Sequence, residues 1–200
     1  MIMKRLFLLL MCSFILNTCS LCHAGGLVAE DFAIHGLKLG ASAEEMQQLL
    51  GEPMFDTDMV QAGVRVKRYT YSPDLKVYMS QETGRVLEIF CKEEKYQARD
   101  GVAYGATRAK LNNVYGEAEH RQIGGLIYYI YRNPENQQQR LMVQIDNDHL
   151  YAKAWTVSVL PLDEEEAMDF AENDKFTAGW RDNERPRFQY HLSKNVTIGN

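Results

Sequence analysis

Two segments of this chain, separated by 65 residues, carry the same pattern of glycines, hydroxyl residues and apolar residues. Six positions of the first segment, 36–53, fall on an identical or similar residue of the second, 101–118: Gly36 on Gly101, Gly40 on Gly105, Ser42 on Thr107, Met46 on Leu111, Gly51 on Gly116 and Glu52 on Glu117. A duplicated unit constrains the fold more than composition does, because both copies are expected to adopt one topology. Such a duplication favours a binding scaffold over a reaction centre.

Each copy contains the signals of one short helix. Ser42 is a favoured N-cap, and Glu45 three residues later completes a capping box. Three apolar residues then recur at helical spacing: Met46, Leu49 and Leu50. Gly51 is a typical C-terminal stop, so the pattern predicts a helix over about 42–50. In the second copy Thr107 stands at the cap position.

Alternating or β-rich runs follow each predicted helix. The expected strands are 64–71, 75–80 and 85–91 in the first copy, and 126–132, 141–145 and 150–159 in the second. The predicted fold class is therefore α+β, with two tandem repeats. Each repeat is expected to be a short helix plus a three-stranded antiparallel meander, with the helices on one face of the sheet.

The repeated pattern of Gly, three residues, Gly, one residue, Ser or Thr, and then Leu-Gly-Glu-Pro precedes a Tyr-x-Tyr strand. It resembles the repeat unit of the beta-lactamase inhibitor protein (BLIP) fold, and it is similar to the SmpA/OmlA (BamE) family of small outer-membrane assembly lipoproteins. The resemblance covers about residues 34–159. The second copy departs from the pattern at Ala118, where the pattern has proline. The resemblance implies the tandem repeat fold, and no contact residue of either family is carried over.

The first 24 residues have the pattern of an export signal. Lys4 and Arg5 precede an apolar run over 6–16, which is too short to span a bilayer. Cleavage is expected between Ala24 and Gly25. The protein is therefore expected to be exported, either periplasmic or secreted. A lipoprotein anchored through Cys19 is the less favoured alternative, since Asn17 and Thr18 precede that cysteine and make a poor lipobox.

The expected organisation after the signal has four parts. They are an N-terminal linker over 25–33, repeat 1 over 34–99, repeat 2 over 100–160, and an acidic helix with a partly disordered tail over 161–200. The whole chain has 22 basic and 27 acidic residues, for a net charge of −5. This acidic balance argues against nucleic acid and anionic membranes as partners. The last part is either a solvated tail or a partner-recognition arm.

The cysteines exclude a disulfide scaffold. Three of the four lie in the signal, which leaves Cys91 alone in the exported chain. Because it ends the apolar run 86–91, Cys91 is expected to be a half-buried strand residue and not a nucleophile.

Enzyme and cofactor motifs are lacking in the sequence. It contains no HExxH, no Gly-x-Ser-x-Gly, no P-loop and no dinucleotide fingerprint. Asp146, Asp148 and His149 are close enough for a metal site, but a polar turn between strands explains them better. The protein is thus expected to be non-catalytic, without cofactor or metal.

Strand alternation predicts which side chains face away from the helices. If Leu75, Val77 and Met79 face the helices, their neighbours on the strand face the other way. The same parity gives a set of outward residues with the composition of an interface: Arg68, Tyr78, Tyr128, Ile130 and Met142. These five residues are the candidate partner-binding site.

The function predicted from the sequence is an exported, non-catalytic binding module. It is expected to recognise a protein or an envelope component through its open sheet face. Two alternatives remain open at this point: an accessory structural subunit of an envelope complex, and a small extracytoplasmic hydrolase. The identity of the partner and the oligomeric state do not follow from the sequence.

Overall fold

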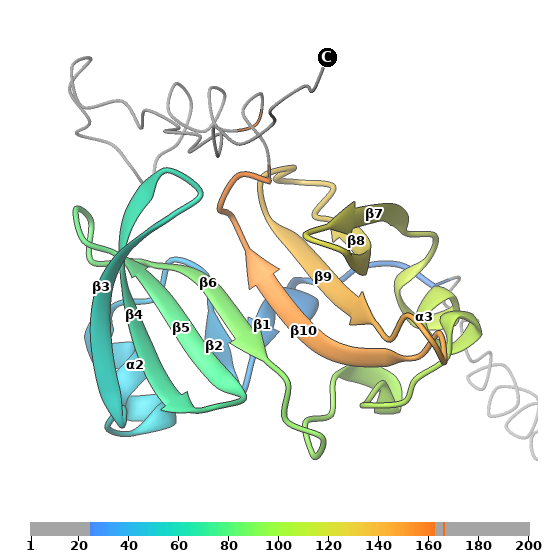
Figure 1. The fold of residues 1–200 in the computed structure, drawn as a ribbon, viewed down its shortest axis with the longest axis horizontal. Coiled ribbons are helices and arrows are strands. Elements are labelled where there is room, and N and C mark those ends of the chain that lie inside the picture. The colour runs from blue at the N-terminus through green and yellow to red at the C-terminus, as the bar shows by residue number, and fades with distance from the viewer. Residues whose placement is uncertain (1–24, 163–165, 167–200) are drawn as a thin grey trace, which may run out of the picture.

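The computed structural model describes residues 25–162 and residue 166, and their fold is mostly β (Figure 1). Eight antiparallel strands form one sheet: β3 (Phe55–Gln61), β4 (Val64–Ser72), β5 (Leu75–Ser80), β6 (Val86–Cys91), β7 (Glu119–Ile123), β8 (Leu126–Arg132), β9 (Arg140–Ile145) and β10 (Ala152–Ser158). The described residues also form two α-helices, α2 (Ala43–Leu50) and α3 (Arg108–Tyr115). Shorter elements complete this part of the chain: η1 (Ala29–Phe32), β1 (Ala33–Ile34), β2 (Leu37–Lys38) and η2 (Arg99–Gly101).

The predicted α+β fold of two helix-plus-three-strand repeats is therefore wrong. Four strands follow each helix, and all eight belong to a single sheet in the order β3-β4-β5-β6-β10-β9-β8-β7. The two four-stranded meanders meet where β10 pairs with β6, with Trp155 opposite Cys91. This pairing joins the two halves of the chain into one sheet.

The two strands missing from the prediction, β3 and β7, are the edges of the sheet. Their side chains are mostly exposed, so neither strand needs the apolar alternation that marks a half-buried strand. The turns beside them did carry a signal. Ala62-Gly63 and Gly124-Gly125 are two-residue hairpin turns with positive φ at both positions, the conformation that such hairpins favour.

The helix ends follow the sequence signals closely. The Ser42 side chain accepts a hydrogen bond from the Glu45 N–H, and Glu45 bonds back to the Ser42 N–H, which completes the predicted capping box. The Thr107 hydroxyl caps α3 in the same way, through the N–H of Lys110. Both helices stop at a glycine with positive φ, 78° at Gly51 and 86° after α3.

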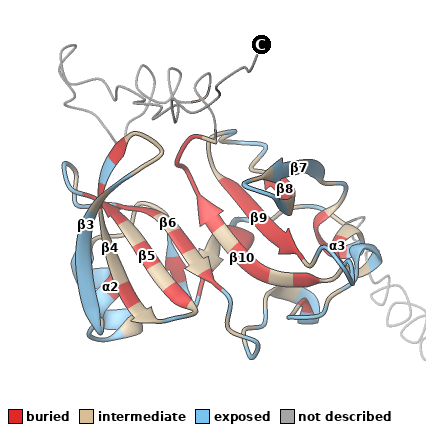
Figure 2. Cartoon of the chain, in the orientation of Figure 1, coloured by how far each residue is buried: buried red, intermediate tan, exposed pale blue. Residues whose placement is uncertain are grey.

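One large core lies between the helices and one face of the sheet (Figure 2). It contains Met46 from α2 and three residues of α3. The inner residues of six strands form a continuous cross-strand row within it: Tyr69, Val77, Ile89, Val157, Leu141 and Tyr131. Leu49, expected on the apolar face of its helix, is instead 53% exposed.

Several expectations lie outside the described residues. They include the export signal with its cleavage site and cysteines, and all of the C-terminal segment except 161, 162 and Glu166. Within the part of the chain that the structure describes, no helix is both long enough and apolar enough to cross a membrane.

Candidate functional site

The face of the sheet opposite the helices carries three cross-strand rows, which together are called the outer face. The first row runs through seven strands: Thr57, Arg68, Tyr78, Glu88, Ser158, Arg140 and Arg132. The second runs beside it: Phe55, Thr70, Lys76, Phe90, Thr156, Met142, Ile130 and Glu119. The third is shorter: Ala154, Gln144, Tyr128 and Arg121. Directly paired residues share a face, so the register fixes these sets.

All five candidate residues predicted from the sequence lie on the outer face, but not at one point of it. Arg68 is paired with Tyr78 on the first half of the sheet. Ile130 is paired with Met142 on the second half, and both are buried. Tyr128 is half-buried on the third row. Three of the five therefore keep part of their surface exposed, whereas Ile130 and Met142 do not.

The outer face is basic although the chain is acidic. Its three rows contain five basic side chains, Arg68, Lys76, Arg121, Arg132 and Arg140, against three acids: Glu88 and Glu119 within the rows, and Glu166 bound to two of the arginines. The sequence prediction from net charge alone missed this local excess. The signal that could have revealed it was the placement of arginines at outward parity in separate strands.

Glu88 lies in the middle of the first row and links the two halves of the sheet. The Ser158 hydroxyl donates a 2.8 Å hydrogen bond to its Oε2 atom. Burial raises the pKa of the Glu88 carboxyl, while the Ser158 hydrogen bond and the Arg140 charge oppose that rise. Burial also raises the pKa of Tyr78 and of Tyr128, and the nearby Glu88 charge adds to both shifts. Both tyrosines therefore present neutral phenols.

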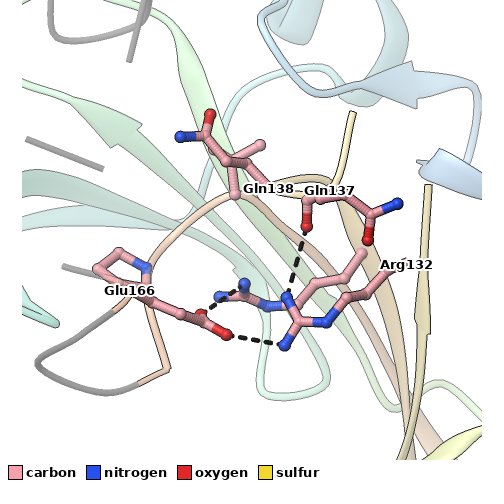
Figure 3. A pocket seen from close by; sticks show the side chains of 7 residues that line it. Arg132, Gln137, Gln138 and Glu166 are labelled. Atoms are coloured by element: carbon pink, nitrogen blue, oxygen red, sulfur yellow. Dashed lines mark hydrogen bonds and ion pairs between the residues drawn. The ribbon is translucent and has the colours of Figure 1, made fainter. Parts of the chain in front are cut away.

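At one end of the first row, two arginines hold a carboxylate (Figure 3). Arg132 Nη2 lies 2.7 Å from Glu166 Oε1, and Arg140 Nη1 lies 3.0 Å from Glu166 Oε2. Burial opposes ionisation of Glu166, but the Leu162 N–H and the two guanidiniums hold the pKa of its carboxyl below the ordinary value. A cavity of about 150 Å³ adjoins this group, lined in part by Gln137.

Unpartnered donors remain on the same row. Arg140 is only 2% exposed, and its Nε and Nη2 atoms have no hydrogen-bond partner among the described residues. The buried Nε of Arg68 has none there either. A buried guanidinium with unused donors is costly to the fold.

The turn that offered a metal site in the sequence is a structural turn. Asp146 Oδ1 accepts hydrogen bonds from the backbone N–H groups of Asp148 and His149, and His149 Nδ1 lies 3.0 Å from the same oxygen. These bonds, together with Lys153, lower the pKa of Asp146 to about 2. The carboxylate is already engaged by its own turn, as the sequence interpretation held.

Cys91 lies at the end of β6, in a strand as expected, and it is fully buried where half-burial was expected. Burial raises the pKa of its thiol to about 11, so it is protonated at neutral pH. Sequence reasoning did not foresee its neighbours: His35 and Glu93 place a ring nitrogen and a carboxylate oxygen within 4.8 Å of its sulfur. No sequence spacing signals this group, because 58 residues separate His35 from Glu93.

Comparison with known proteins gives neither a sequence family nor a curated relative: no family model and no curated protein matches the chain. Solved structures that resemble it include a cysteine-rich secretory protein from Staphylococcus aureus, with a TM-score of 0.46 and 13% identity over 83% of this chain. A DUF4309 family protein from Bacillus subtilis has a TM-score of 0.42 and 14% identity over 62% of this chain. The chain spans 58% of the length of the first and 82% of the second.

A beta-lactamase inhibitor protein candidate from Streptococcus mutans is also among these structures. Its TM-score is 0.27 at 13% identity, and the match covers 61% of this chain and 85% of that one.

Proposed function

We propose that this protein is an exported, non-catalytic binding module that recognises an acidic segment of a partner protein through its outer face. Export is supported by the signal-like pattern of residues 1–24. The binding surface comprises Arg68 and Tyr78 on one half of the sheet and Tyr128 and Arg132 on the other.

One observation carries the proposal: the outer face collects five basic side chains on a chain whose net charge is −5. Segregated charge of this kind steers an oppositely charged partner and fixes its orientation. The carboxylate of Glu166, held by Arg132 and Arg140, illustrates how this face binds an acid. Tyrosine and arginine are also the residues that most often dominate interface energetics.

The non-catalytic part of the proposal rests on the chemistry of the polar groups. The Cys91 thiol is held in its protonated form, and Asp146 is already bound by its own turn. A His35 ring nitrogen lies within 4.8 Å of the Cys91 sulfur, but burial keeps the thiol protonated, whereas a nucleophilic cysteine needs a lowered pKa.

Site-specific photocrosslinking in the producing cells tests the surface directly. A photoreactive amino acid replaces Tyr78 or Tyr128 on the outer face, and a third variant carries it at the exposed Leu49 on α2. The proposal predicts a discrete adduct at both outer positions and none at Leu49. Mass spectrometry of that adduct should identify a partner peptide rich in Asp and Glu.

The edge strand β3 is the main rival surface, because Val60 on it is 63% exposed. An adduct formed at Val60 but at neither tyrosine would move the binding site to the sheet edge and contradict the proposal. With a partner in hand, Tyr128→Ala should weaken binding by about 1–3 kcal/mol. At position 78 the binding test should use Tyr78→Phe, because Tyr78 also packs on a small buried cluster around Val64 and Val66 and Tyr78→Ala would disturb that packing.

A further inference from the structure

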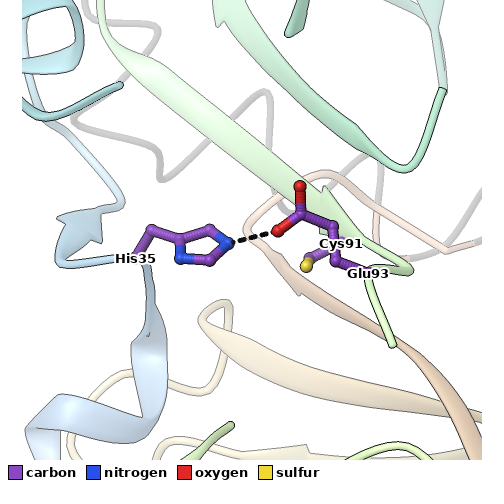
Figure 4. A group of neighbouring side chains, drawn as sticks. All are labelled: His35, Cys91 and Glu93. Atoms are coloured by element: carbon purple, nitrogen blue, oxygen red, sulfur yellow. Dashed lines mark hydrogen bonds and ion pairs between the residues drawn. The ribbon is translucent and has the colours of Figure 1, made fainter. Parts of the chain in front are cut away.

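Three side chains with different metal-binding atoms converge at the end of β6 (Figure 4). His35, Cys91 and Glu93 each place a ligand atom within 4.8 Å of the other two. His35 Nε2 lies 2.9 Å from Glu93 Oε2, and the Cys91 sulfur lies beneath this pair. This group is called the His-Cys-Glu cluster below.

The cluster is assembled by tertiary structure from two distant segments. His35 occupies the turn between β1 and β2, and Cys91 is the last residue of β6, with Glu93 two residues beyond. His35 has a φ of 51° and its turn neighbour Gly36 has a φ of 81°. Histidine tolerates this left-handed conformation better than most residues, but it remains unusual for a side chain to be held there.

Neighbouring groups fix the orientation of the imidazole and leave one side of the cluster open. The ring of Tyr96 packs edge-on against His35, 5.2 Å between centroids, and also against Trp155, 5.5 Å between centroids. A cavity of about 520 Å³ has His35 and Tyr96 in its wall. The cluster therefore rests on the core through buried Cys91, while the side chains of His35 and Glu93 are partly exposed to solvent.

We propose that the His-Cys-Glu cluster binds one Zn²⁺ ion through His35 Nε2, Cys91 Sγ and a Glu93 carboxylate oxygen. Thiolate, imidazole and carboxylate are the donors that zinc takes in proteins, and a thiolate disfavours Mg²⁺ and Ca²⁺. A water molecule completes the tetrahedron, as where a protein supplies three zinc ligands. On binding, the Cys91 thiol releases its proton to solvent, the proton that His35 Nε2 shares with Glu93 is lost from Nε2 and the imidazole keeps its proton on Nδ1, and the His35–Glu93 hydrogen bond gives way to two bonds to the metal.

Bound zinc would join the β1–β2 hairpin to β6 at the point where the two halves of the sheet meet, since Cys91 is paired with Trp155 of β10. The simpler interpretation is that His35 and Glu93 form only an ion pair that fastens the hairpin. The two interpretations differ in one respect: only the zinc site requires the sulfur of Cys91.

The test uses the purified protein, first freed of metal with a chelator, with Zn²⁺ and Co²⁺ as probes. Competition with a chromophoric chelator should show one tight Zn²⁺ site. Co²⁺ in that site should give visible bands of a tetrahedral ion and a near-ultraviolet thiolate-to-metal band. Zn²⁺ should also raise the melting temperature, as any ligand specific for the folded state does.

Three variants remove one ligand each: Cys91→Ala, Glu93→Gln and His35→Asn, the last chosen because asparagine also tolerates the left-handed turn. Each should weaken Zn²⁺ binding by more than about 100-fold, because loss of even an outer partner of a zinc ligand costs 10- to 100-fold. The matched control is His149→Gln, beside the acidic turn at Asp146. It should leave Zn²⁺ binding unchanged.

Absence of a tight Zn²⁺ site would overturn the proposal in favour of the ion pair alone. Zinc affinity that Cys91→Ala leaves intact, or a Co²⁺ spectrum without the thiolate band, would overturn it by showing that the sulfur is not a ligand. Loss of binding in His149→Gln would place the metal at the turn instead and would overturn it equally. If Cys91→Ala proves unfolded by circular dichroism, Glu93→Gln and His35→Asn decide the matter, since both positions reach the surface.

Discussion

Replacing Asp31 by alanine should lower the free energy of unfolding by about 3 kcal/mol, because its carboxylate is the buried half of an ion pair. The Asp31 side chain is 1% exposed, and its oxygens accept hydrogen bonds from Arg99 Nε and Nη2, both at 3.0 Å. The Val28 N–H donates a third bond at 2.9 Å. Arg99 also donates to the carbonyls of Gly26 and Val114, so the pair fastens the N-terminal segment to the end of α3.

The expected magnitude follows from the unequal burial of the two partners. Breaking a buried ion pair costs about 3–5 kcal/mol when the remaining charge is left buried. The remaining Arg99 is 25% exposed and keeps two carbonyl acceptors, so Asp31→Ala belongs at the lower end of that range. Arg99→Met should cost more, about 4 kcal/mol, because it leaves the almost fully buried Asp31 carboxylate with one backbone donor.

Urea unfolding at neutral pH, followed by circular dichroism, gives the free energies. The control is Asp56→Ala, which breaks an exposed ion pair to Lys67 at 3.5 Å and should cost no more than about 1 kcal/mol. The double variant of Asp31 and Arg99 should cost less than the sum of the single variants, because neither charge is then left alone. Equal stability of the Asp31→Ala and Asp56→Ala proteins would refute the reasoning.

Three further predictions concern pH and packing. Because burial raises the pKa of Glu88, the folded state keeps a proton that the unfolded chain loses near pH 4.5. The free energy of unfolding should therefore fall as pH rises from about 4.5 through the raised pKa of the folded state. Glu88→Gln should remove that fall and raise the melting temperature at neutral pH, whereas melting curves that keep the same pH dependence would contradict this assignment. The pKa of Asp146, measured by NMR, should be about 2. The stability that its carboxylate contributes should be present above pH 3.8 and be lost as pH falls toward 2. An ordinary pKa would argue against the hydrogen bonds of the turn. Leu111→Ala, at a fully buried position of α3, should lower the free energy of unfolding by about 2–5 kcal/mol. Leu49→Ala, on the exposed side of α2, should lower it by no more than about 0.5 kcal/mol. Similar losses of unfolding free energy in urea would show that the helix faces are wrongly assigned.

Local structure was largely decided by the sequence. The Ser42 capping box and the glycines that stop α2 and α3 depend on contacts within a few residues, so the pattern predicted them correctly. Strand alternation likewise placed Arg68 and Tyr78 on one face, because side chains alternate whatever the partner strand is.

The number of strands and their order were decided only by the tertiary structure. β3 and β7 are stabilised by pairing with β4 and β8 and not by burial of an apolar face, so periodicity could not reveal them. The pairing of β6 with β10 depends on the whole sheet, and no local signal in either strand specifies it.

The outer face and the His-Cys-Glu cluster both consist of residues that are far apart in the sequence and are brought together only by the fold. The outer face gathers Arg68 and Arg140 through cross-strand register over five strands. Met142, in the second row of that face, is buried by the packing of the folded chain. The His-Cys-Glu cluster needs the β1–β2 turn to lie against the end of β6, 58 residues away for its most distant pair. Residue types and their parity are local properties, and the convergence of side chains is a property of the folded sheet alone.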